Sequence, residues 1–130
     1  MKKIAILLAL CAGIFVSGCT ELNNAIDEYC SWESYCGYRS YGECSDRYHD
    51  YARDFNCDYE IIEMAYAYQN LTCRAYRDYA NSVDPCQNYL NNGYHTYDEC
   101  QYAMDAVYRA DTELRHCVGN GAYYDQPVWF

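Results

Sequence analysis

Apolar residues recur at helical spacing along much of the chain, in steps of three, four or seven residues. Side chains at these steps share one face of a helix. Three such stripes are Cys44, Tyr48, Tyr51 and Phe55; Tyr59, Ile62, Tyr66, Cys73 and Tyr76; and Tyr97, Cys100, Met104, Val107 and Leu114. No convincing strand alternation is present. The pattern predicts an all-α protein.

The chain also contains an internal repeat at an offset of 56 residues. GYRSYGEC at 37–44 and GYHTYDEC at 93–100 are identical at five of eight positions. Cys30 and Cys86 have the same offset. Such self-similarity indicates a duplicated unit, with one copy near 29–84 and the other near 85–118.

Each copy carries the signals of a helix start. Ser40 with Glu43, and Thr96 with Glu99, have capping-box spacing, in which the hydroxyl accepts from the third helical N–H. The helices should begin near Tyr41 and Tyr97.

Turn signals precede both caps. Gly37 and Gly93 suit the left-handed position that ends a helix. Asp84 and Pro85 are typical of the first residues of the helix before Gly93. Each unit is therefore predicted to be helix, glycine turn and capped helix, and the whole a small disulfide-stapled bundle of two such units.

The first residues are typical of an export signal. Lys2 and Lys3 precede an apolar run over 4–16, which is too short to span a membrane. Val16-Ser17-Gly18-Cys19 then resembles the lipobox of bacterial lipoproteins. The resemblance implies cleavage before Cys19, lipid on that cysteine, and a membrane as partner through the lipid.

Thr20 follows the cysteine where inner-membrane lipoproteins carry Asp, so the resemblance implies an outer-membrane location in the bacterial envelope. The alternative is ordinary secretion, with Cys19 as a plain thiol. The expected organisation is signal peptide 1–18, lipidated tether 19–28, Cys-rich helical domain 29–118 and aromatic tail 119–130. The tail either docks on the bundle or binds a partner.

The cysteine count agrees with export. Of ten cysteines, Cys11 leaves with the signal and Cys19 takes the lipid, so an even eight remain. An even number in an oxidising compartment favours four disulfides. The eight residues lie five or more positions apart, which disfavours a zinc site.

Symmetry about the two glycines suggests part of the pairing. Residues equidistant from a hairpin turn lie at one height, within disulfide reach. The remaining four cysteines are expected to pair between units, where other pairings stay open. The predicted disulfides are Cys30–Cys44, Cys86–Cys100, Cys36–Cys73 and Cys57–Cys117.

The net charge and the tyrosine content limit the partners that the protein is expected to bind. Both lysines lie in the signal, which leaves seven arginines against nineteen acidic residues, a net charge of −12. Such a body repels nucleic acid. Eighteen tyrosines accompany only three phenylalanines. The tyrosines indicate either a thin core in which the hydroxyl of each ring reaches water, which we favour, or a recognition surface.

No catalytic or cofactor motif was found, so no enzymatic activity is predicted. The cluster of Asp46, His49, Asp50 and Asp54 indicates a solvated helix face or, as an alternative, a cation site. Asp111 and Arg115 are expected to form an exposed i,i+4 pair.

The sequence therefore predicts an envelope lipoprotein with a structural or protein-binding role. The alternatives are an inhibitor-like binder, a cation-binding protein, and a redox protein using Cys30 and Cys36.

Overall fold

The computed structural model describes residues 16–119 of the chain. Over this range it contains five α-helices, a short 3-10 helix and no strand, so the all-α prediction is confirmed. The expected signal (1–18) and aromatic tail (119–130) lie largely outside the described residues. The elements are α2 (Val16–Tyr35), α3 (Tyr41–Phe55), α4 (Asp58–Tyr68), α5 (Cys73–Ala80), η1 (Pro85–Asn88) and α6 (Tyr97–Val118).

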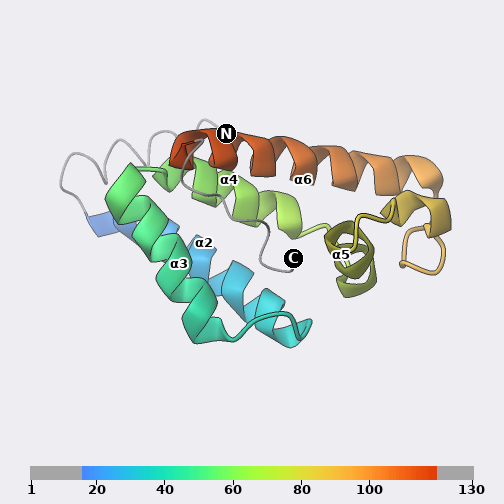
Figure 1. The fold of residues 1–130 in the computed structure, drawn as a ribbon, viewed down its shortest axis with the longest axis horizontal. Helices are drawn as coiled ribbons and strands as arrows, with labels where there is room; N and C mark the ends of the chain where they lie inside the picture. Colours follow the sequence, from blue (N-terminus) through green and yellow to red (C-terminus); the bar gives the residue numbers. More distant parts are fainter. Residues whose placement is uncertain (1–15, 120–130) are drawn as a thin grey trace.

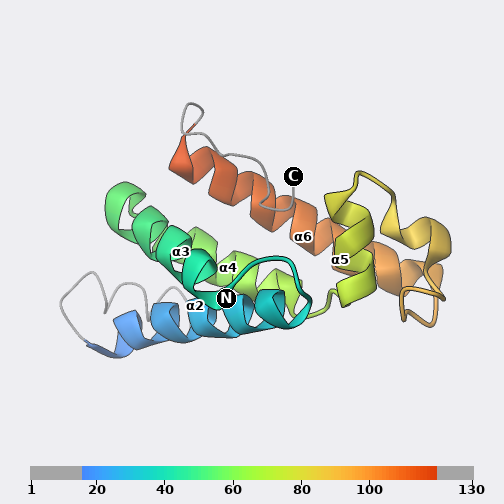
Figure 2. The same cartoon turned by 60° about the horizontal axis from the view of Figure 1, so that its bottom comes forward.

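Helix α4 is the centre of the bundle. It packs against α2 on one side and α6 on the other, and these are the most extensive helix contacts. Helices α2 and α3 form a hairpin beside α4, while α5 and η1 lie toward the other end of the molecule (Figures 1 and 2). The core therefore consists of two interfaces that share one helix.

The repeated caps form as expected. Ser40 and Thr96 each accept the backbone N–H of the Glu three residues later, at 3.2 and 3.1 Å. The helices begin at the next residue in both cases. Gly37 and Gly93 have φ of 85° and 94°, which only glycine adopts at low cost. The repeat therefore encodes two equivalent turns.

The second unit departs from the expected helix before its glycine. Pro85–Asn88 is a single 3-10 turn, and irregular turns lead from there to Gly93. Pro85 stands where the first unit has Tyr29, which lies inside α2. Proline can begin a helix, but it lacks an N–H and clashes with a preceding turn, so the element cannot extend back through this position as α2 does. The second hairpin is therefore shorter than the first.

The segment 19–28, expected as a tether, belongs instead to α2. Leu22, Ala25 and Ile26 are buried in the core. Their spacing is that of a helical stripe, which continues into Tyr29. The folded body therefore begins near residue 22 rather than 29. No helix within residues 16–119 is long and apolar enough to cross a membrane.

The second predicted apolar stripe, which runs from Tyr59 to Tyr76, agrees only partly with the structure. A turn at 69–72 divides it between α4 and α5, and Tyr66 is 38% exposed. Ile61, Met64 and Ala65 are buried instead. Because α4 lies between two helices, it buries more than one face, and a single stripe does not describe it.

Four disulfides join the eight cysteines between residues 30 and 117, and none of these eight is free. Their Cα–Cα distances lie between 5.3 and 5.9 Å. Two close the repeated turns and two connect distant helices, in the pairs expected from the sequence. The pairs are Cys30–Cys44, Cys86–Cys100, Cys36–Cys73 and Cys57–Cys117.

Candidate functional site

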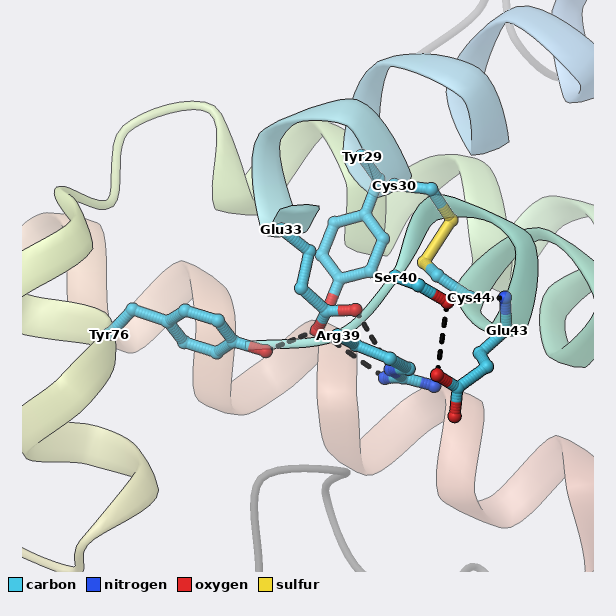
Figure 3. Close-up of polar contacts among 8 residues, drawn as sticks. All are labelled: Tyr29, Cys30, Glu33, Arg39, Ser40, Glu43, Cys44 and Tyr76. Atoms are coloured by element: carbon cyan, nitrogen blue, oxygen red, sulfur yellow. Dashed lines mark hydrogen bonds and ion pairs between the residues drawn. A yellow bond between two sulfur atoms is a disulfide. The ribbon is translucent and has the colours of Figure 1, made fainter. Parts of the chain in front are cut away.

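A carboxylate from α2 is fully buried where α2, the first turn and α5 meet (Figure 3). Glu33 has no exposed surface, and its Oε2 accepts a hydrogen bond from the Tyr29 hydroxyl at 3.0 Å. The Tyr76 hydroxyl of α5 donates to the same oxygen. Arg39 Nη2, from the turn, donates to it at 3.3 Å. Glu33 therefore binds three elements together.

Arg39 also forms an ion pair with this carboxylate. Its Nε lies 3.0 Å from Glu33 Oε1, and its side chain is 7% exposed. The contact is close but not aligned as a hydrogen bond, and Arg39 Nη1 is buried without a hydrogen-bond partner. The guanidinium carbon lies 5.9 Å from the centre of the Tyr48 ring, which adds a cation–π contact.

Asp111 is a second buried acid, and not the exposed partner of Arg115 expected from the sequence. It is 4% exposed. Its Oδ2 accepts from the hydroxyls of Tyr68 in α4 and Tyr79 in α5, at 2.8 and 2.6 Å. Burial raises the pKa of Asp111 to about 6, against the lowering effect of the two tyrosine hydrogen bonds. Asp111 thus joins α4, α5 and α6.

Neither acid is placed to act on a ligand. Both are buried, and one oxygen of each, Glu33 Oε2 and Asp111 Oδ2, accepts hydrogen bonds from two or more side chains of the protein. Buried acids with shifted pKa values can mark active sites, but structural networks shift them as well. Here the two carboxylates act as internal clamps.

An aromatic cleft opens between α2 and α4. It has a volume of about 180 Å³ and is lined by Glu28, Tyr29, Trp32, Ala65, Tyr68 and Gln69. The Trp32 ring centre lies 6.1 Å from that of Tyr29 and 5.8 Å from that of Tyr68. Glu28 and Gln69 are exposed, and Gln69 Nε2 donates to the Glu28 carboxylate at 3.3 Å.

A larger groove follows the other side of α4, along α6. Its main part has a volume of about 280 Å³, and a further 200 Å³ continues past Asn70 and Tyr102. The small side chains of Ala67, Ala106 and Ala110 leave it hollow. Tyr102, 76% exposed, projects beside it. We call this hollow the α4–α6 groove.

The charges along the α4–α6 groove are mostly negative. Glu63, Glu99 and Glu113 line it, against a single arginine, Arg109, among the lining residues. Burial raises the pKa of Glu63; the neighbouring Glu113 adds to the increase and Arg109 opposes it. The groove therefore favours positively charged ligands.

The acidic face of α3 does not converge on a cation site. Arg53 pairs with Asp50 and Asp54, at 2.7 and 3.0 Å. Within residues 16–119 the one group of metal-ligand type with its atoms within 4.8 Å is Cys57, Glu60 and Cys117. Its two sulfurs form a disulfide and offer no thiolate.

The redox interpretation also lacks a cysteine pair. Cys30 and Cys36, the pair that it would use, belong to two different disulfides.

Comparison with known proteins adds no assignment. No protein-family model, curated protein or solved structure matches the chain. The two open clefts beside α4 are the features of the described residues best suited to bind another molecule. The apolar pattern of the sequence predicts neither cleft, because both clefts depend on how α4 packs against the neighbouring helices.

Removing the charge of Glu33 should cost stability. Glu33→Gln leaves Arg39 buried without its counter-ion, and breaking a buried pair costs about 3–5 kcal/mol. The free energy of unfolding is measured by urea titration with the disulfides intact. Glu28→Gln, on the exposed side of α2, is the matched control and should change it by less than about 0.5 kcal/mol. Equal losses of unfolding free energy in the two variants would contradict the role of Glu33 as a clamp.

Asp111 should make stability fall as pH rises. Its folded pKa of about 6 lies above the ordinary 3.8, so the folded state holds a proton that the unfolded state has lost. The contribution of Asp111 to the free energy of unfolding is fully present below about pH 4. It is lost, by about 3 kcal/mol, as the pH rises through about 6. Unfolding is measured from pH 3.5 to 7 for the wild type and Asp111→Asn. Subtracting the two curves should leave this decline, and a flat difference would disprove it.

Proposed function

We propose that the chain is a lipid-anchored protein of the bacterial envelope whose helical body binds a basic segment of a partner protein in the α4–α6 groove. The anchor rests on the lipobox-like residues 16–19. Three acyl chains hold a protein firmly where one would be marginal. Catalysis has no part in this proposal, since the buried acids serve as clamps.

The anchor lies close to the body. Glu21 accepts a hydrogen bond from the hydroxyl of Tyr66 in α4, and Leu22 is already buried. Only Thr20 separates Cys19 from these contacts. A lipid on Cys19 would therefore hold the body close to the membrane surface, without a long flexible linker between them.

The observation that carries the binding role is the α4–α6 groove itself. It combines alanine-lined depth, an exposed tyrosine and three glutamates, in a body of net charge −12. Tyrosine is enriched at interfaces, and complementary charge accelerates the encounter of partners. The aromatic tail fits less well, because residues 119–130 contain Asp125 and no lysine or arginine that could match a negative groove.

Replacing Cys19 tests the anchor. In bacteria fed an alkyne-bearing fatty acid, the wild type should be labelled and sediment with membranes. Cys19→Ser should lose the label and accumulate as uncleaved precursor. Cys11→Ser, in the same signal segment, is the matched control and should behave as the wild type. An unlabelled wild type, or a labelled Cys19→Ser, would overturn the anchor.

Site-specific photocrosslinking tests the groove. A benzophenone amino acid at Tyr102 should give a discrete adduct in cells, whereas one at Tyr35, which is 85% exposed elsewhere, should not. Mass spectrometry should identify a peptide rich in Lys and Arg. Glu113→Gln should reduce the yield several-fold, and Asp46→Asn on α3 should not.

Two results would contradict the proposal for the groove. Equal adducts at positions 102 and 35 would show no preference for it. An adduct with residues 119–130 of the same chain would assign the groove to the tail. Neither result bears on the lipid anchor, which the Cys19 experiment tests separately.

A further inference from the structure

We propose that Trp32, Tyr68 and Asp111 form a relay that carries an oxidising equivalent from the edge of the core into its interior. A small one-electron oxidant removes an electron from Trp32. Tyr68 then replaces that electron, while its phenol proton passes to Asp111. The three residues lie on α2, α4 and α6, so the relay crosses the bundle. This inference depends on neither the lipid anchor nor the α4–α6 groove.

Trp32 is the member of the relay that an oxidant can reach. Its side chain is half-buried, whereas Tyr68 beside it is 2% exposed. Trp32 is also among the lining residues of the cleft between α2 and α4. Tryptophan is the most easily oxidised aromatic side chain at neutral pH. An oxidant at this surface therefore acts on Trp32 first.

Tyr68 is placed to supply the electron. Its ring centre lies 5.8 Å from that of Trp32, and electrons move readily between rings this close. Burial raises the pKa of the Tyr68 hydroxyl, and the charge of Asp111 adds to the increase, so the phenol keeps its proton until its ring is oxidised. A phenol that has lost an electron is a strong acid. Its proton can then pass to Asp111 Oδ2, which lies 2.8 Å from the hydroxyl.

Asp111 is a good proton acceptor because its buried charge is disfavoured. Burial raises its pKa to about 6, although the hydrogen bonds from Tyr79 and Tyr68 and the charge of Arg115 lower it. The charge of Glu33 adds to the increase. Accepting a proton therefore removes a charge from the core, which a buried site favours.

The ring nearest to Trp32 is a poorer acceptor of the oxidising equivalent. Tyr76 has its ring centre 4.9 Å from that of Trp32, but its hydroxyl donates to Glu33 (Figure 3). Protonating Glu33 would remove the counter-ion of Arg39, whose Nε lies 3.0 Å from Oε1. The relay therefore runs to Tyr68, although Tyr76 is closer.

Electrons and protons balance in this transfer. The oxidant gains one electron and leaves Trp32 as a cation radical. Tyr68 gives one electron to Trp32 and one proton to the Asp111 carboxylate. The products are neutral Trp32, a neutral Tyr68 radical and an uncharged Asp111 carboxylic acid.

Pulse radiolysis with the azidyl radical tests the relay. Azidyl oxidises tryptophan faster than un-ionised tyrosine, and Trp129→Phe leaves Trp32 as the single tryptophan. The protein is the oxidised full chain in maltoside detergent at neutral pH. The absorption of the tryptophan radical should decay at the rate at which that of a tyrosyl radical grows. This rate should not depend on protein concentration, and it should be lower in D₂O because a proton moves with the electron.

Matched variants in the same background identify the electron donor. Tyr68→Phe and Asp111→Asn should each prolong the tryptophan radical several-fold, with folding checked by circular dichroism. Tyr76→Phe removes the nearest ring and is the control, which should leave the lifetime close to that of the parent chain. Unchanged lifetimes in Tyr68→Phe or Asp111→Asn, or an equal or larger effect of Tyr76→Phe, would overturn the inference.

The pH dependence of the parent chain tests the relay without a substitution in the core. Because transfer requires ionised Asp111, its rate should fall as the pH drops through about 6. Asp111→Asn should remove this dependence, which separates Asp111 from Glu33. A rate that ignores pH in the parent chain, or the same fall in Asp111→Asn, would contradict the relay. The charged and titratable groups that interact with Asp111 are Glu33, Tyr48, Tyr68, Tyr79, Tyr108 and Arg115.

Discussion

The structure depends on the burial of two carboxylates in a small helical core. An unpaired buried charge costs far more than one hydrogen bond returns, so each acid requires donors from several directions. Glu33 obtains them from α2, the first turn and α5, and Asp111 from α4 and α5. Helix α5 has eight residues, too few to be stable alone. Its two tyrosines, one on each acid, therefore fix a helix that its own hydrogen bonds would not maintain.

This requirement explains the preference for tyrosine over phenylalanine. The sequence suggested rings whose hydroxyls reach water, and the exposed Tyr102 fits that description. Tyr68 and Tyr76 do not, because they are buried and their hydroxyls end on carboxylates. One side chain thus supplies both apolar area and the donor that the buried charge needs. Arg39 similarly contributes a planar fork, which a lysine would lack.

Local spacing made the turns and the two hairpin disulfides predictable, since caps, glycines and symmetric cysteines depend on residues near in sequence. The other two disulfides join residues 37 and 60 positions apart, and no local signal selects their pairing. The buried acids were missed, although a signal was present. Glu33 continues the steps of four and three from Leu22, Ile26 and Tyr29, and Asp111 does the same after Val107 in α6. An acid in an apolar stripe points inward. The i,i+4 spacing with Arg115 predicts an exposed acid instead, because helical pair rules consider one helix alone; Arg115 does lower the pKa of Asp111, but the acid is buried. The clefts depend on packing between helices, which spacing does not encode.

The buried acids also determine the shape of the aromatic cleft. Tyr29 and Tyr68 are among its lining residues, and their hydroxyls donate to the buried Glu33 and Asp111. A ring fixed at its hydroxyl cannot turn into the cleft without leaving a buried carboxylate short of a donor. The two rings are therefore held in one position where they line the cleft. The interaction that stabilises the fold is thus the one that keeps the cleft open.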